Sequence, residues 1–210
     1  MLLGASIVQD TSPVIRGDGV LLRPASMSDY AAWAALRDRS RAALTRWEPQ
    51  WSLDELTRTS FRRRVRHYAR ESREDLGYAF LIFLPGGHLA GGLTLSNVRR
   101  GVTQSATIGY WLGAEYCGRG LMTAAIRAAI PFVFDVLKLH RLDAAVMPAN
   151  SPSVAVLERA GFVREGLARR YLKIAGRWED HLIYALLADD VGAVPKRSDA
   201  EAAVPAEEAR

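Results

Sequence analysis

The spacing of apolar and polar residues changes several times along this chain, and each change predicts an element of secondary structure. Alternating or β-branched apolar runs predict strands at 20–23, 78–84, 88–96, 107–112, 141–146, 167–174 and 178–187. Helical spacing and helix-start signals predict helices at 30–41, 52–73, 121–136 and 153–160. Strands and helices in this order favour an α/β (α+β) fold, a mixed sheet with helices on both faces.

Turn and cap residues mark the ends of these elements. Pro85-Gly86-Gly87 and Ala175-Gly176 predict two hairpins. The order Ser52-Leu53-Asp54-Glu55 fits a capping box, in which the serine hydroxyl and the glutamate carboxylate each satisfy an otherwise unpaired N–H, so the second helix should begin there. Pro131 should bend the long helix, because it has no N–H to donate. That helix has an apolar stripe expected to lie on the sheet, formed by Leu121, Ala125, Ala128, Phe132 and Val136.

Length and composition indicate one soluble globular domain. The chain has 210 residues, of which 49% are apolar and 24% charged. Residues 1–14 and 189–210 have no apolar periodicity, so we expect a mobile N-terminal segment and a disordered C-terminal tail around a domain at 15–188. The N-terminal run lacks the positive start of a signal peptide, and no window approaches the length of a membrane span. With Cys117 as the single cysteine and no histidine spacing that suits a metal, we expect a cytoplasmic protein without disulfide or zinc.

Basic residues are concentrated in part of the chain. The net charge is +5, and 25 of the 28 basic residues are arginine, seven of them between Arg58 and Arg73. Such a surface attracts polyanions, among them phosphate-bearing cofactors, RNA or a ribosomal surface. A solvated helix face explains the same residues equally well, so the charge alone assigns no partner.

A glycine-rich turn opens the long helix at residue 121. It follows the strand Ile108-Gly109-Tyr110-Trp111-Leu112 and reads Cys117-Gly118-Arg119-Gly120-Leu121-Met122. Glycines let a backbone approach a ligand closely, and the unpaired N–H groups of a helix start attract phosphate oxygens. The dinucleotide fingerprint fails because its third glycine would fall on Thr123, and the P-loop fails because no G-K-[ST] is present. The turn therefore predicts a diphosphate ligand of another class.

These residues resemble the GCN5-related N-acetyltransferases (GNAT), whose motif [QR]-x-x-G-x-[GA] binds the pyrophosphate of acetyl-CoA. Gly120 matches that motif, whereas Cys117 and Met122 depart from it. The chain is most similar to one branch, the ribosomal-protein-alanine acetyltransferases of RimJ/RimL type, and closest to RimJ, over roughly residues 15–188. The matching positions are Trp47-Glu48-Pro49, Ser96-Asn97-Val98, Gly109-Tyr110, Gly118 to Met122, His140-Arg141, Met147-Pro148, Asn150, Ser153, Gly161-Phe162, Glu165-Gly166, Tyr171, Trp178 and Asp180-His181.

The resemblance implies a GNAT fold, with a mixed, mostly antiparallel sheet of about six to seven strands and helices on both faces. It also implies acetyl-CoA as cosubstrate and no metal. Backbone groups of Tyr110, Trp111 and Leu112 would pair with pantetheine, and Asn150 and Ser153 would reach the cofactor near the thioester. The pyrophosphate would be held by Cys117, Gly118, Arg119, Gly120, Leu121 and Met122.

The acid and the base are assigned with alternatives. An amine attacks the thioester directly, so a proton donor beside the departing sulfur is useful. Leu157 stands where many family members have a tyrosine, which leaves Ser153 as the candidate acid, unless Ser153 and Asn150 only cap a helix. Glu48 is the candidate base, or it caps a turn.

The acceptor wall is inferred from the same resemblance, which assigns substrate contacts to Trp47, Asn97, Tyr171 and Asp180. Asp180 is a weaker candidate base, or it pairs with an arginine. Trp47, Tyr171 and Trp111 can equally be aromatic residues of the apolar core. Cys117 is not favoured as a nucleophile, because the sequence places no activating base beside it.

The leading interpretation is acetyl transfer to the N-terminal α-amine (Ala or Ser) of a ribosomal or similar protein, with a small-subunit ribosomal protein as the expected partner. A second interpretation keeps the chemistry and changes the acceptor to a polyamine, an aminoglycoside or another small amine. The basic body disfavours a cationic acceptor. A third is a CoA-binding module associated with RNA or the ribosome. No RNP, KH or zinc-knuckle pattern is present, so RNA contact is expected only through the ribosome.

Overall fold

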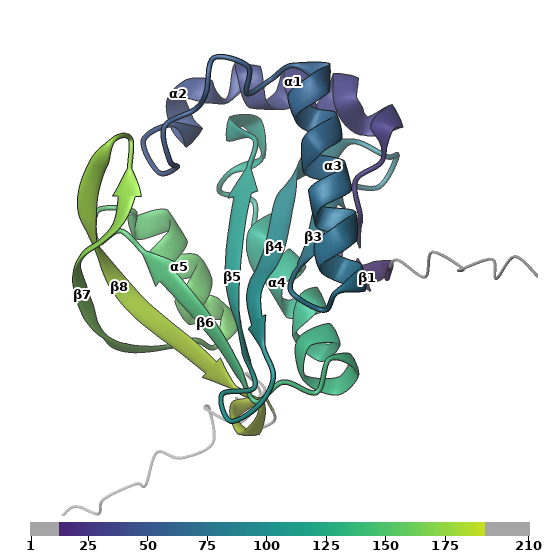
Figure 1. The fold of residues 1–210 in the computed structure, drawn as a ribbon. Helices are drawn as coiled ribbons and strands as arrows, with labels where there is room; N and C mark the ends of the chain where they lie inside the picture. The colour runs from purple at the N-terminus through teal and green to yellow at the C-terminus, as the bar shows by residue number, and fades with distance from the viewer. Residues whose placement is uncertain (1–12, 192–210) are drawn as a thin grey trace, which may run out of the picture.

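Eight strands form one open sheet in the computed structural model, which describes residues 13–191 (Figure 1). Their order is β1-β2-β3-β4-β5-β6-β8-β7, and every neighbouring pair is antiparallel except β5 and β6. The strands are β1 (Ile15–Gly17), β2 (Val20–Arg23), β3 (Tyr78–Phe83), β4 (Leu89–Arg99), β5 (Ser105–Leu112), β6 (Arg141–Val146), β7 (Val163–Ile174) and β8 (Arg177–Leu187). The expected mixed, mostly antiparallel sheet is confirmed. It has one strand more than expected, because the three residues of β1 are too few to show a period.

Helices cover both faces of this sheet. The α-helices are α1 (Tyr30–Arg39), α2 (Arg41–Leu44), α3 (Arg58–Arg73), α4 (Leu121–Pro131) and α5 (Ser151–Ala160). Short helical turns lie at η1 (Met27–Asp29), η2 (Ala114–Tyr116), η3 (Phe132–Val136) and η4 (Ala188–Asp190). None of the helices in the described part of the chain is long and apolar enough to cross a membrane.

The start of α3 differs from the sequence prediction. The helix begins at Arg58, with Thr57 as its cap accepting a hydrogen bond from the Ser60 N–H at 3.2 Å, and not at Ser52. The Ser52 hydroxyl donates instead to Asp54. The carboxylate of Glu55 forms ion pairs with arginine side chains, so it does not serve the capping box that the sequence suggested.

The long helix changes its winding at Pro131. After that residue the chain continues as a π-helical turn, in which the Leu137 N–H donates to the carbonyl of Phe132, five residues earlier. A wider turn rotates the following side chains out of the earlier stripe, and π-turns interrupt helices in this way. Val136 is consequently 65% exposed, so its predicted place on the sheet is wrong.

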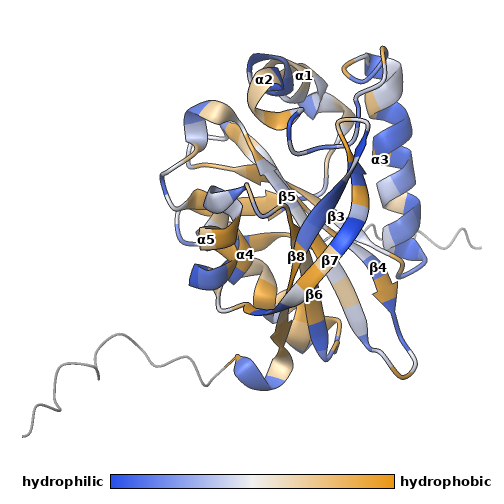
Figure 2. Cartoon of the chain, turned by 90° about the vertical axis from the view of Figure 1, so that its left-hand side faces the viewer, coloured by the Kyte–Doolittle hydropathy of each residue, from blue (hydrophilic) through white to orange (hydrophobic). Residues whose placement is uncertain are grey.

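Two apolar clusters hold the layers together, one on each face of the sheet. Alternate residues of β3 serve both, since Phe80 and Ile82 belong to the larger cluster with α4 and α5. Leu81 packs on the opposite face with Trp33 and Phe61, from α1 and α3. Figure 2 shows α4 largely hydrophobic and the length of α3 largely hydrophilic. The sheet is therefore fixed from both sides.

The described residues continue slightly past the expected domain end. The Ala188 N–H donates to the carbonyl of His140, and the Leu187 N–H donates to the carboxylate of Asp190 at 3.0 Å. Apart from residues 13–14 and 189–191, the expected mobile N-terminal segment and C-terminal tail lie outside the described residues.

Candidate active site

A cleft opens where β5 and β6 part. The two strands pair only at their first three residues, Ser105–Thr107 with Arg141–Asp143. Beyond these pairs β4 follows β5 to Leu112, and β8 follows β6 to Val146. The facing edges of β5 and β6 are therefore left without a strand partner, and residues of both line a cleft of about 710 Å³. Unpaired backbone edges accept a ligand that carries its own amide groups, because backbone N–H and C=O groups require partners.

The glycine-rich turn forms one wall of this cleft, and all its residues from Cys117 to Met122 line it. Gly118 and Gly120 have φ values of 74° and 73°, a left-handed conformation that favours glycine, and Gly120 caps the start of α4. No atom lies within 4 Å of where a Cβ would stand on either residue. The turn therefore presents open space in front of helix-start N–H groups, the arrangement that binds phosphate oxygens.

The start of α5 forms another wall, tied to β5 across the cleft. Asn150 caps the helix, its side-chain oxygen accepting from the Ser153 N–H at 3.4 Å. The Tyr110 hydroxyl donates to the Ser153 carbonyl at 3.3 Å, and burial raises the pKa of Tyr110 to about 12, so this phenol stays protonated. Both contacts use backbone atoms of Ser153, whose hydroxyl has no hydrogen bond within residues 13–191. The capping role thus belongs to Asn150.

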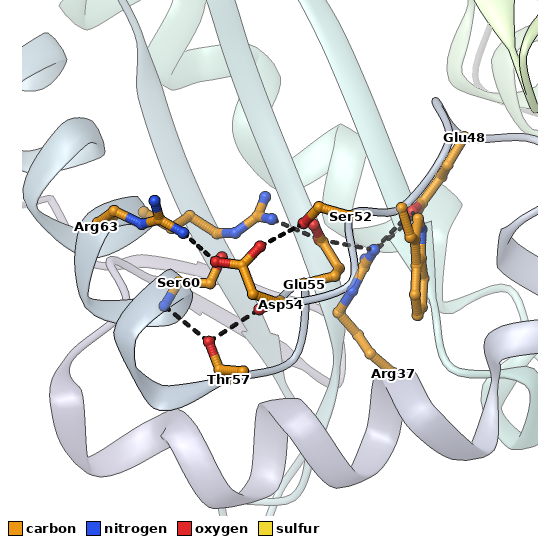
Figure 3. Close-up of polar contacts among 10 residues, drawn as sticks. Arg37, Glu48, Ser52, Asp54, Glu55, Thr57, Ser60 and Arg63 are labelled. Atoms are coloured by element: carbon orange, nitrogen blue, oxygen red, sulfur yellow. Dashed lines mark hydrogen bonds and ion pairs between the residues drawn. The ribbon is translucent and has the colours of Figure 1, made fainter.

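Arg37 organises a polar cluster beside the cleft, and the sequence analysis did not single it out. The residue is only 5% exposed, and its guanidinium donates from Nη2 to Glu48 Oε2 at 2.6 Å and from Nη1 to Glu48 Oε1 at 3.2 Å. Glu55 approaches the same guanidinium at 3.7 Å (Figure 3). The guanidinium carbon lies 4.5 Å from the ring centroid of Trp51 and 4.9 Å from that of Trp111.

The hydrogen bonds of Glu48 bear on its expected role as base. Its Oε2 atom also accepts from the Trp51 Nε1–H at 2.7 Å, so both carboxylate oxygens are engaged. Three of the roughly four lone-pair positions of the carboxylate are thus occupied, and protonation would weaken its charged pairing with Arg37. The geometry argues against Glu48 as the base and gives it the role of fixing the wall of the cleft, which it lines together with Trp47.

A second cavity, of about 500 Å³, lies against the first. It is lined by residues of α1, α3 and β3 to β5, and it shares Glu48, Gly109, Tyr110 and Trp111 with the cleft. Glu48 and Glu55 both line it, but each is paired with an arginine, Arg37 or Arg64. The two cavities therefore adjoin at β5, and the carboxylates of the second one are already neutralised.

Three residues expected at the acceptor wall line neither cavity. Asn97 is exposed at a bulge of β4, in the left-handed region (φ 53°), beside the end of β5 opposite Leu112. The Asp180 carboxylate accepts from the Arg170 backbone N–H at 2.7 Å, where the register of β7 is irregular, so it pairs with backbone and not with an arginine side chain. Tyr171 is half exposed. The structure does not bring these three to the cavities.

His181 and Cys117 also line the cleft. His181, which the sequence analysis gave no role of its own, is buried and lines it. Cys117 is exposed, and its thiol lies 3.6 Å from the Gly113 carbonyl oxygen. Within residues 13–191 no three histidine, cysteine or acidic side chains are grouped so as to hold a metal ion.

Comparisons with known proteins agree with this geometry. Residues 20–163 match the family model described as the acetyltransferase (GNAT) domain. The chain is 36% identical to the probable N-acetyltransferase YjcK of Bacillus subtilis over 84% of its length and 98% of the relative's. It is 32% identical to the [ribosomal protein uS5]-alanine N-acetyltransferase of Escherichia coli over 78% and 82% of the two lengths. The structure of Mycobacterium smegmatis RimJ in complex with CoA-disulfide has a TM-score of 0.79 and 37% identity, covering 88% of this chain and 89% of the other.

Proposed function

Because this chain belongs to the acetyltransferase (GNAT) family, and is an N-acetyltransferase of the RimJ/RimL type, we propose that it acetylates the N-terminal α-amine of a ribosomal or similar protein. The cleft between β5 and β6, with the glycine turn on one wall and Ser153 on another, carries this proposal. The Escherichia coli relative is named for an alanine of a ribosomal protein, which supports a terminal Ala or Ser on a small-subunit protein as acceptor. We expect the enzyme to meet this acceptor in the cytoplasm.

The residues present suit acetyl-CoA. The free edge at Tyr110, Trp111 and Leu112 offers backbone partners for the amides of pantetheine, and the turn from Cys117 to Met122 offers N–H groups for the pyrophosphate. Acetyl-CoA supplies an activated acyl group with a thiol as leaving group. The hydroxyl of Ser153, free of other partners in the described chain, donates the proton that this thiol requires.

Substitution of Gly120 by valine should weaken acetyl-CoA binding by about tenfold, or about 1.4 kcal/mol. The branched side chain would occupy the open space in front of the helix start, where phosphate oxygens must approach. Isothermal titration calorimetry with acetyl-CoA measures the change. Gly19→Val is the matched control, because Gly19 has a similar φ of 66° and similar open space, in the turn between β1 and β2. Equal affinities of the two variants would contradict the assignment of the phosphate site.

The enzyme should prefer a terminal α-amine to a lysine side chain. Attack requires a neutral amine, and with reference pKa values near 8 and 10.4, roughly 10% of an α-amine and about 0.04% of a lysine are neutral at pH 7. Two peptides test this preference, one with a free N-terminal Ala and blocked lysines, the other acetylated at its terminus with free lysines. We expect the first to react at least about tenfold faster. Faster reaction of the second between pH 7 and 9 would overturn the proposal.

Spermidine in the same assay tests the small-amine alternative. The second cavity offers a polycation no unpaired carboxylate among its described lining residues, because Glu48 and Glu55 are bound by Arg37 and Arg64. We therefore expect spermidine to react more slowly than the α-amine peptide. The reverse order would favour a polyamine acetyltransferase.

A further inference from the structure

We propose that His181 is the general base that receives the proton of the attacking amine. The inference rests on the acetyl transfer described above and adds a residue to it. No role had been expected of this histidine, and the carboxylate that had been expected to act as base is engaged by Arg37 and Trp51. His181 is only 3% exposed, and it lines the cleft.

The register of β8 places His181 at the open end of the parted strands. Leu182, the next residue, pairs with Val146, the last residue of β6, and the chain then leads through Met147 to Asn150 and Ser153 at the start of α5. Leu182 and every second residue after it point into the larger apolar cluster beside α4 and α5. His181 therefore points to the opposite side of the sheet. Ala43, Leu44 and Trp47, in and just after α2, line the same cleft.

The hydrogen bond of the ring fixes which nitrogen is free. The Nδ1 atom lies 3.0 Å from the carbonyl oxygen of Glu179. Because a carbonyl only accepts, Nδ1 must carry the hydrogen and donate it, and the neutral ring then has its lone pair on Nε2. No described residue donates to Nε2 or accepts from it. The nitrogen that remains for a ligand in the cleft is thus a basic one.

The other titratable groups around the cleft do not supply such a lone pair. Tyr110 stays a protonated phenol, Glu48 is held by Arg37, and the Cys117 thiol donates to the Gly113 carbonyl at 3.6 Å. The remaining titratable residues of the lining are two arginines, Arg119 and Arg159, which are always cationic.

The groups packed directly against the imidazole offer no competing base. Tyr171 on β7 meets the ring edge-on, with centroids 6.0 Å apart. On β8 itself the neighbouring Asp180 carboxylate is bound to the backbone of Arg170. Among the described residues that line the cleft, His181 is therefore the one whose side chain offers a free basic nitrogen.

In the proposed step, His181 accepts one proton and Ser153 donates another. The amine lone pair attacks the thioester carbonyl carbon, an N–C bond forms and the C–S bond breaks. The proton on the new amide nitrogen goes to His181 Nε2, and the departing sulfur takes the proton of the Ser153 hydroxyl. The serine oxygen regains a proton from the imidazolium through solvent, so the neutral amine and acetyl-CoA give amide and free thiol with no net proton exchange.

The His181→Asn variant tests the role of Nε2 separately from the structural hydrogen bond. The asparagine amide stands where Nδ1 does and can still donate to the Glu179 carbonyl, but it has no basic atom in the cleft. With the N-terminal Ala peptide we expect kcat/KM to fall about 10²-fold, while the Kd of acetyl-CoA stays unchanged. Added imidazole should restore part of the lost rate. His88→Asn, at an exposed turn between β3 and β4, serves as the control.

The pH dependence gives an independent readout. The wild-type profile of kcat/KM should bend twice, once for the imidazole and once for the peptide amine, and His181→Asn should remove the first bend. Wild-type kcat/KM with the same pH profile in His181→Asn would overturn the inference. A loss of activity that imidazole does not restore, with both bends retained, would also overturn it, because that pattern indicates a structural role. Failure of the wild-type enzyme itself to acetylate the peptide would instead contradict the proposed acceptor.

Discussion

Replacing Arg37 with leucine is expected to lower the free energy of unfolding by about 3 kcal/mol. The substitution removes the cation that binds both oxygens of Glu48, and it leaves this carboxylate uncompensated in a mostly buried place, whereas Glu55 keeps its pairing with Arg64. Removing one partner of a buried ion pair is costly because the remaining charge loses its compensation. Equilibrium denaturation in urea, with m-values compared, measures the change.

Two further variants make the Arg37 prediction specific. Arg39→Leu removes an arginine of the same helix whose ion pair with Glu115 is exposed, so its cost should stay below about 1 kcal/mol. The double variant Arg37→Leu with Glu48→Gln should recover part of the stability, because the stranded charge is gone. Equal decreases in the free energy of unfolding for Arg37→Leu and Arg39→Leu would show that burial of the Arg37 cluster adds nothing to stability.

Ser153→Ala should lower kcat about 10²-fold with little change in acetyl-CoA affinity, because protonation of the departing sulfur matters mainly in the transition state. The substitution removes the hydroxyl and leaves the backbone contacts of this residue in place. Asn150 and Tyr110 contact the backbone of Ser153, so the helix cap and the link to β5 survive the loss of the hydroxyl. Single-turnover kinetics isolates the chemical step. Ser153→Cys retains a proton donor and should be less impaired than the alanine variant. A normal chemical rate in Ser153→Ala would leave this serine without a catalytic role.

The glycine turn of the candidate site could be predicted because its geometry depends on the backbone. Glycines before an amphipathic helix predict a turn with positive φ and free N–H groups, and Gly118 and Gly120 have that geometry. The parting of β5 from β6 was beyond the sequence pattern, since both strands keep a strand-like period to their ends. It is a tertiary feature, visible only when the pairing register is known.

The polar cluster around Arg37 escaped prediction for a different reason. Arg37 joins Glu48 and Glu55, residues 11 and 18 positions away, and no local spacing predicts an ion pair over such distances. Glu55, expected in a capping box, pairs with Arg37 and Arg64 instead, and α3 begins at Arg58 with Thr57 as its cap. Matching a family position likewise did not reveal that Asn97 lies at a bulge of β4 and does not line the cleft.

The short parallel pairing of β5 with β6 makes this sheet two half-sheets joined by a narrow seam. Three residue pairs connect β1–β5 to the β6–β8 half within the sheet, and the Tyr110 hydroxyl adds one more link across the gap. A ligand that bonds to both free edges bridges the seam, so its binding free energy also resists separation of the halves. Loss of such a ligand would remove that contribution and leave the two halves held by the three residue pairs, the Tyr110 contact and the apolar cluster beside α4 and α5.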